Sequence, residues 1–267
     1  MAVLAFLHST GACKIHPMKI YVYLLSGLFI SILCAESQTA EDILLKTFHR
    51  MDGIDHSFRV NSQNSGKKKK EKHFQASVHW PSEGNIISQT RVMSIDSKRK
   101  KPSSFWIQRF RDGTKTKKWM SMPITGKLKD ISDKKAGKKE FSFSELAVTD
   151  EEIKAHDHTL LPKENIDTLL AYVIKSKKMN KKGKIKESKK LWIDADSYMI
   201  LKVEFYTGSG RLFRSIECSD FHYVEDILFP LMIDIQDLKS KTDAQIAIKD
   251  IILNPQFDLD IFIPRDQ

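Results

Sequence analysis

The alternation of apolar and polar residues with a period of two is the strongest constraint that this sequence places on its fold. Met199, Leu201, Val203 and Phe205 occupy every second position of one short segment, and the glycine-containing turn 207–210 follows directly. A period of two places successive side chains on opposite faces of a β-strand. Such segments, when they are joined by short turns, predict antiparallel strands that are neighbours in a sheet.

Similar segments recur along most of the chain, and about ten of them in one domain would curl strongly or close partly into a barrel. We therefore expect a mainly β protein built on one antiparallel sheet. The alternation returns once more in the tail 257–263. The predicted strands are residues 74–80, 86–95, 104–111, 117–122, 169–175, 189–194, 199–206, 212–218, 227–238 and 241–253.

Two short helices are expected among these strands. Thr39 and Asp42 have the spacing of a capping box, which marks the start of a helix. Leu44, Phe48 and Met51 then fall on one helical face, and the Asp-Gly pair after Met51 ends the helix. A second helix is predicted over residues 150–156, where an acidic segment follows a capping threonine.

Residues 1–35 have the pattern of an export signal. Lys19 precedes the apolar run 20–33, which ends at Cys34 and Ala35, small residues that suit a signal peptidase. The run is shorter than the roughly 20 apolar residues that a membrane span needs. We expect cleavage near Ala35, which leaves residues 36–267 as a single domain.

Two alternatives at the N-terminus stay open. Cys34 could carry a lipid, although Leu33 stands where bacterial lipoprotein signals have a small side chain. Met18 starts the signal pattern well, so residues 1–17 are interpreted as an upstream extension and Met18 as an alternative start to Met1. Removal of the signal leaves Cys218 as the only cysteine, which excludes an internal disulfide.

The chain carries a formal net charge of +10, with 41% hydrophobic residues, enough for a real core. Its lysines gather in predicted loops and hairpin ends, where charge protects strand edges from aggregation. The sharper interpretation is attraction to an anionic membrane surface. Nucleic acid fits less well, because no aromatic residues are interleaved with the lysines. The basic runs are residues 67–72, 98–101, 134–139 and 175–190.

Several segments, in this order, resemble the LolA-like family of outer-membrane lipoprotein-sorting proteins, and most closely a spirochaete-type branch of it. The resemblance covers roughly Ala40 to Pro264, and its specificity comes from the order and spacing of the segments. The segments are Trp119–Pro123, Phe141–Leu146, Leu191–Asp194, Leu201–Tyr206, Gly210–Arg214 and Asn254–Ile263.

The resemblance implies an α+β fold in which a curved antiparallel sheet forms an incomplete barrel, with helices covering its concave side. It further implies an exported periplasmic protein that binds lipid or lipoprotein acyl chains in an apolar groove, for transport or sorting toward the outer membrane. An inner-membrane transporter would be its other partner. Related branches of this fold act as envelope sensors, so an adaptor that binds a protein remains the alternative.

Adaptable apolar side chains suit a groove that must accept and release acyl chains. Ordinary core packing is the alternative for each of these positions. The residues Leu44, Phe48 and Met51 are candidates for a lid helix over the groove. The groove candidates are Trp80, Met93, Trp106, Phe110, Met120, Met199, Leu201, Val203 and Phe205.

Catalysis finds little support in the sequence, so we expect no enzyme, no cofactor and no metal. His156 and His158 could supply two metal ligands, but no third ligand stands at a recognisable spacing. The chain contains no G-x-S-x-G motif, no H-E-x-x-H motif and no glycine-rich phosphate loop. Cys218 lies on the apolar face of a predicted strand, which favours a buried small hydrophobic residue over a nucleophile.

Overall fold

The computed structural model describes residues 38–64, 70–95, 102–122, 125–133 and 148–266, and residues 39–267 form one compact unit. The predicted signal segment 1–35 and the basic runs 98–101 and 134–139 lie outside the described residues, as do residues 67–69 of the run 67–72. Within the described part of the chain, no helix is both long and apolar enough to cross a membrane.

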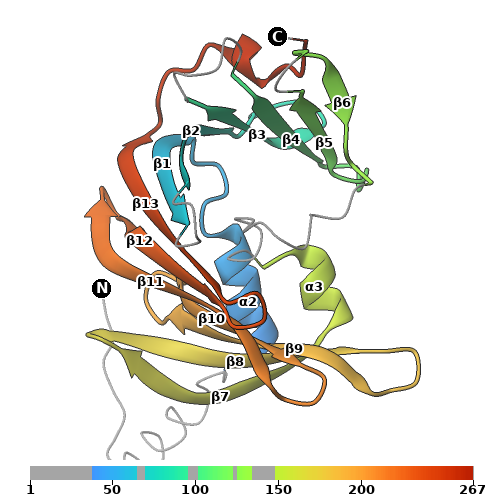
Figure 1. Ribbon diagram of the computed structural model, residues 1–267, viewed down its shortest axis with the longest axis vertical. Helices are drawn as coiled ribbons and strands as arrows, with labels where there is room; N and C mark the ends of the chain where they lie inside the picture. Colours follow the sequence, from blue (N-terminus) through green and yellow to red (C-terminus); the bar gives the residue numbers. More distant parts are fainter. Residues whose placement is uncertain (1–37, 65–69, 96–101, 123–124, 134–147, 267) are drawn as a thin grey trace, which may run out of the picture. The chain divides into compact units, whose positions relative to one another are not determined.

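Thirteen strands form one antiparallel sheet with the order β6-β5-β4-β3-β2-β1-β13-β12-β11-β10-β9-β8-β7. The sheet is open, with β6 and β7 at its edges, and it curves strongly (Figure 1). The predicted open, curved, mainly β architecture is therefore confirmed. The strands are β1 (His56–Asn64), β2 (Lys70–His79), β3 (Ile86–Ser94), β4 (Ser104–Phe110), β5 (Lys117–Ser121), β6 (Leu128–Asp130), β7 (Asp157–Ile166), β8 (Leu169–Met179), β9 (Ile185–Asp194), β10 (Ile200–Thr207), β11 (Leu212–Val224), β12 (Ile227–Asp237) and β13 (Thr242–Leu253).

Helices α2 (Ala40–His49) and α3 (Asp150–Ala155) begin where the sequence predicts. The capping box of α2 is complete, because Thr39 Oγ1 accepts from Asp42 N at 3.1 Å and Asp42 Oδ2 accepts from Thr39 N at 3.0 Å. Figure 1 shows α2 inside the curve of the sheet. We call the sheet face that packs against α2 the inner face and the opposite one the outer face.

The register of β8 and β9 separates two clusters of buried residues. Ile174 pairs with Leu191, and both pack with Ile43 and Leu44 of α2 on the inner face. Val173 pairs with Trp192 one position along, so these two side chains point to the outer face and belong to a different cluster. Both faces of this half of the sheet are therefore closed by apolar packing.

The C-terminal tail covers the outer face of the other half. Trp106 Nε1 donates to the carbonyl oxygen of Ile261 at 2.9 Å, and both Trp106 and Phe262 are buried. The tail forms the short 3₁₀ helix η2 (Leu259–Phe262). Alternation of residues 257–263 would have pointed Phe262 away from its apolar neighbours, but the 3₁₀ turn directs it inward beside His79 and Phe257.

Three strands were missed by the alternation pattern. The inner-face row of β1 is interrupted by polar residues, and β6 is only three residues long. Residues 157–166 contain Pro162, which argued against a strand, yet β7 accommodates the proline at a register shift between Leu161 and Glu164 on the edge of the sheet.

The packing of α2 predicts a sharp contrast between two adjacent leucines. Leu44 is fully buried, whereas Leu45 is 38% exposed. Leu44→Ala should lower the free energy of unfolding by about 3 kcal/mol, because it leaves a cavity in the core. Leu45→Ala, the matched control on the same turn, should change it by less than about 1 kcal/mol. Urea unfolding followed by circular dichroism measures both, and equal losses would mean that α2 is not docked through Leu44.

Candidate functional site

A row of directly paired apolar residues crosses the inner face of the first five strands. Phe58 pairs with Ala76, Ala76 with Val92, Val92 with Phe105, and Phe105 with Met120. Directly paired residues share a face, so the five side chains form one line from β1 to β5. We call this line the apolar row. With neighbouring strands about 4.8 Å apart, it spans about 19 Å.

The apolar row is only partly covered by the rest of the protein. Phe58, Val92, Phe105 and Met120 are all half-buried, and only the small Ala76 is buried. Ordinary core residues in the second half of the sheet, such as Ile174 and Leu191 in the preceding section, have no exposed surface to speak of. The row is therefore apolar surface that the described protein does not fully fill.

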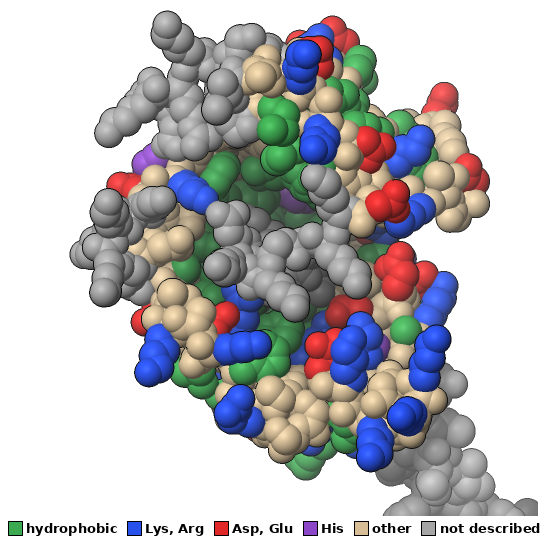
Figure 2. All heavy atoms as spheres, turned by 45° about the vertical axis from the view of Figure 1, so that its right-hand side comes forward, with side chains coloured by type: hydrophobic (Ala, Val, Ile, Leu, Met, Phe, Trp, Pro, Cys, Tyr) green, Lys and Arg blue, Asp and Glu red, His purple; other side chains and the backbone are tan. Residues whose placement is uncertain are grey.

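One face of the molecule is hollowed. Figure 2 shows a recess in which hydrophobic side chains gather, with both basic and acidic side chains around its edge. Phe205 of β10 connects the two halves of the face, because it packs both on the cluster that includes Phe58 and Phe74 and on the cluster beneath α2. The apolar surface is thus continuous across the sheet.

Arg109 joins the C-terminal end of α2 to the sheet. Its guanidinium carbon lies 4.7 Å from the ring centroid of Phe48 and 6.0 Å from that of Trp80. The backbone N–H of Trp80 donates to Asp55 Oδ1 at 2.7 Å, which fixes this corner. An arginine between two aromatic rings contributes favourable cation–π contacts and holds the end of α2 over the inner face.

Arg50, the C-cap residue of α2, connects the same end of the helix to β12. Its Nη2 donates to the carbonyl oxygen of Leu228 at 2.6 Å. Burial lowers the pKa of Arg50 to about 10, while the nearby Asp194 acts in the opposite direction. Cys218 is buried in the adjacent cluster, as predicted, and burial raises the pKa of its thiol to about 12.

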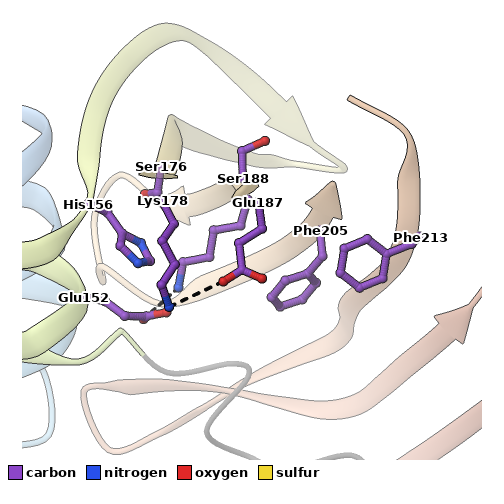
Figure 3. Close-up of a pocket in the computed structure, with 9 residues that line it drawn as sticks. Glu152, His156, Ser176, Lys178, Glu187, Ser188, Phe205 and Phe213 are labelled. Atoms are coloured by element: carbon purple, nitrogen blue, oxygen red, sulfur yellow. Dashed lines mark hydrogen bonds and ion pairs between the residues drawn. The ribbon is translucent and has the colours of Figure 1, made fainter. Parts of the chain in front are cut away.

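A small cavity of about 130 Å³, lined by both charged side chains and phenyl rings, lies between α3 and the ends of β8 to β11 (Figure 3). The phenyl rings of Phe205 and Phe213 form its apolar side, with centroids 6.2 Å apart. Its volume is below the roughly 300 Å³ of a small-molecule site, so alone it does not enclose a large ligand. The lining residues are Glu152, His156, Ser176, Lys178, Glu187, Ser188, Lys189, Phe205 and Phe213.

Two ion pairs compensate the charges of this cavity. Lys189 Nζ lies 2.8 Å from Glu152 Oε2, and the Lys189 side chain is only 9% exposed. Lys178 Nζ lies 3.4 Å from Glu187 Oε1 near the mouth. The charges in the lining of the cavity are therefore close to balanced, and Phe205 links the cavity to the apolar inner face.

The two histidines next to this cavity differ in their partners. His158 Nδ1 lies 2.8 Å from Ser176 Oγ and its Nε2 lies 3.0 Å from the carbonyl oxygen of Ile153, so both ring nitrogens are engaged. His156 Nδ1 is buried with no hydrogen-bond partner among the described residues. Burial lowers the pKa of His156, although Glu152 opposes this. Among the residues described, no three His, Cys, Asp or Glu side chains group as metal ligands.

Four of the nine predicted groove residues lie on the inner face. Met120 ends the apolar row, Phe205 lines the cavity, Val203 packs beneath α2, and Trp80 contacts Arg109. Val203 is fully buried and is core in the described structure, whereas the other three are half-buried.

The other five predicted groove residues lie on the outer face. Met93 is paired with Ser104 and accepts from Arg91, and Trp106 is held by the tail. Phe110 follows Trp106 by four positions on the same face and contacts Lys117. Met199 and Leu201 pack with Trp192 because a bulge between Ile200 and Lys202 reverses their direction relative to Val203.

The lid-helix candidates divide along the length of α2. Leu44 is locked into the core, and Lys46 Nζ donates to Tyr198 Oη at 3.1 Å, which ties the middle of the helix to the sheet. Phe48 is partly buried under Arg109, and Met51 lies beyond the helix in the following turn. The structure therefore places α2 as a docked helix, with only its last turn over the hollow.

The sequence analysis missed most of the apolar row. Phe58 lies in a strand whose other residues are largely polar. Phe105 is adjacent to Trp106, which points to the opposite face and is the residue that the sequence pattern favours for the groove. The pairing of β3 with β4 would have revealed them, because Val92 and Phe105 stand at equal distances along the chain from the middle of the turn that joins the two strands. Such a pairing requires the register of the hairpin, which the sequence alone does not provide.

A protein-family model described as an uncharacterized protein matches residues 89–266, more than half of the chain. The chain belongs to this family. The matched region covers strands β4 to β13 and the tail. It therefore includes the cavity and three residues of the apolar row, Val92, Phe105 and Met120. Among curated proteins, no sequence matches.

Solved structures confirm the predicted resemblance to LolA-like proteins at the level of fold. A DUF1329 family protein from Desulfovibrio piger has a TM-score of 0.66 at 16% identity, covering 84% of this chain and 95% of that chain. A putative outer membrane lipoprotein-sorting protein domain from Vibrio parahaemolyticus has a TM-score of 0.65 at 16% identity, covering 83% and 95%. A LolA superfamily protein from Nitrosomonas europaea has a TM-score of 0.57 at 20% identity, covering 84% and 97%.

The ion pair inside the cavity predicts that two adjacent glutamates differ in their contribution to stability. Glu152→Gln leaves the buried Lys189 ammonium without its partner, whereas Glu151 is exposed. We expect Glu152→Gln to lower the free energy of unfolding by about 2 kcal/mol, less than for a fully buried pair because Glu152 is itself a third exposed. Glu151→Gln is the matched control and should have little effect in the same urea titration.

Proposed function

We propose that this protein is a non-enzymatic carrier of the cell envelope that binds lipid or lipoprotein acyl chains on its inner face. The observation that carries the proposal is the apolar row, in which four large apolar side chains stay half-buried and are not covered by the described tail and helices. Protein surface of this kind is costly to leave in water and commonly marks a binding site.

The dimensions of the apolar row fit one acyl chain. A bilayer core of about 30 Å is filled by two leaflets, so one acyl chain is about 15 Å long. The row spans about 19 Å across five strands. Burial stabilises a bound chain by about 0.8 kcal/mol per CH₂, which suffices for micromolar binding even when only part of the chain is covered.

The chemistry of the lining supports a carrier more than an enzyme. Phenylalanine, valine and methionine side chains offer adaptable contact without hydrogen bonds that would select one cargo, and this favours exchange. The continuous surface through Phe205 leads to the cavity, where the head group of an amphiphilic cargo would remain hydrated. Transport or sorting toward the outer membrane, after export by the segment 1–35, is the cellular role that we propose.

Similarity to solved structures supports the proposal at the level of fold. One of these structures is named as an outer membrane lipoprotein-sorting protein domain, and another as a LolA superfamily protein. The fold alone does not determine cargo. The physical argument therefore rests on the half-buried row.

Two methionines on opposite faces of the same part of the sheet test this proposal. Met120 lies on the apolar row and Met93 on the outer face, and both are half-buried. Met120→Gln should weaken binding of a fluorescent fatty acid about tenfold, because it removes apolar contact and adds a polar group to the row. Met93→Gln should leave the affinity within about twofold.

Native mass spectrometry of protein purified from the periplasm should also detect bound lipid. Equal effects of the two methionine substitutions would contradict binding on the inner face. A lipid-free protein that instead co-purifies with a stoichiometric protein partner would favour the adaptor alternative, in which the same apolar row receives a peptide.

A further inference from the structure

The antiparallel order of the sheet places alternate turns at opposite ends of the strands. The turns after β8, β10 and β12 lie at one end, because these three strands run parallel to one another, and the turns after β7, β9 and β11 lie at the other end. We call the first group, together with the adjoining ends of β8, β9 and β10, the basic rim; it comprises residues 177–186, 207–211 and 238–241. We call the second group, residues 167–168, 195–199 and 225–226, the acidic rim.

Charge is completely separated between the two rims. The basic rim contains eight lysines and one arginine without a single acidic residue. The acidic rim contains three aspartates and one glutamate without a lysine or arginine. Charges that only kept strand ends soluble would have no reason to differ in sign between the two ends of strands β7 to β12. These six strands therefore carry opposite charge at their two ends.

Two turns of the basic rim lie against one another. A Cβ atom on Gly208 would be 2.4 Å from the carbonyl oxygen of Ile185 and 3.0 Å from that of Lys186, so the β10–β11 turn touches the base of the β8–β9 hairpin. Within the described residues, no acidic side chain forms an ion pair with Lys181, Lys182 or Lys184. Their charges are therefore available to a partner.

Exposed apolar side chains accompany these lysines. Met179 and Ile185 are directly paired at the base of the hairpin turn and are 40% and 39% exposed. Leu238, in the turn after β12, is 52% exposed. Cations that surround a few exposed apolar residues match the interface of a lipid bilayer, where head groups attract the charge and the acyl boundary accepts the apolar side chains.

We propose that the basic rim docks the protein onto the surface of an anionic lipid bilayer. The cavity opens next to this rim, since Lys178, Glu187 and Phe213 line it and belong to the same strand ends (Figure 3). Docking therefore places this cavity, and Phe205 in its wall, beside the lipid. This last consequence rests on the proposed function, whereas the docking itself does not.

Nucleic acid and acidic proteins fit the basic rim less well. Single-stranded nucleic acid is held by aromatic rings between the cations, and the rim carries Met179, Ile185 and Leu238 in their place. An acidic protein surface would leave these three apolar residues unmatched. Both partners are outcomes of the test below.

Vesicle co-sedimentation of the full-length purified protein tests the docking. The protein should bind vesicles of phosphatidylcholine mixed with phosphatidylglycerol, and added salt should weaken this binding. Vesicles of phosphatidylcholine alone should bind far less. The triple variant Lys181→Gln, Lys182→Gln and Lys184→Gln should weaken binding to the anionic vesicles about a hundredfold.

A matched triple variant controls for net charge. Lys115, Lys129 and Lys249 are exposed and lie away from the basic rim, so their replacement by glutamine removes the same charge. It should weaken vesicle binding by less than about threefold. A second variant, Met179→Ser with Ile185→Ser, keeps every charge and should weaken the binding that remains at high salt.

Three results would overturn the docking proposal. They are equal losses from the two lysine triples, equal binding to neutral and anionic vesicles, and tight binding to RNA or an acidic protein without binding to anionic vesicles. The fluorescent fatty acid, measured without vesicles, separates this proposal from the proposed function. The rim variants should retain its affinity, whereas failure of the carrier proposal would remove fatty-acid binding and leave vesicle binding intact.

Discussion

The rest of the structure depends on one constraint. The two faces of a strongly curved sheet are covered only by short helices and a C-terminal tail among the described residues. An antiparallel sheet of thirteen strands has far more apolar surface than two short helices can bury. Around β8 to β10, α2 and α3 close the inner face with Ile43, Leu44 and Ile153. Over β1 to β5 no described helix takes the same role, and the apolar row stays half-buried. The hollow is thus a consequence of where the helices attach.

On the outer face of strands β1 to β5, the C-terminal tail covers the sheet. Trp106 and Phe262 are buried there, and small side chains such as Ser57, Ser77 and Ser104 leave room for the tail to approach. Ser121 Oγ accepts from the backbone of Ser104 at 2.7 Å, so the buried amide of Ser104 is satisfied locally. The contrast with the row of Phe58, Val92 and Phe105 on the other side of the same strands is what makes the inner face a candidate site.

The sequence predicts the elements well and the faces poorly, for a physical reason. Alternation and capping residues are local, so the capping box at Thr39, the helix after Thr149 and most strands were identified correctly. A side chain's face depends on register, and one extra residue at a bulge reverses it. The bulge between Ile200 and Lys202 moves Leu201 to the face opposite Val203, although the two residues alternate perfectly in sequence.

Tryptophan was a misleading guide to the site for a related reason. A large aromatic residue on an alternating strand suits a ligand groove and a dry core equally well, and only long-range contacts separate the two. Trp106 finds its partner at Ile261, 155 residues away in sequence, and no local pattern reports such a contact. The half-buried residues that do line the hollow are smaller and stand in segments with weaker patterns.

The cavity and the basic rim are electrostatically compatible, because lysines are paired with glutamates in the cavity and lie in water at the tips of the rim. At the cavity, Lys189 and Lys178 are each paired with a glutamate, so a bound amphiphile meets no uncompensated buried charge, which would be costly in a region of low dielectric constant. At the tips of the turns the lysines remain unpaired in water, where charge costs little and acts over about one Debye length. A long-range attraction that orients the molecule and a short-range apolar surface that holds cargo can therefore coexist on adjacent strand ends, without either one weakening the other.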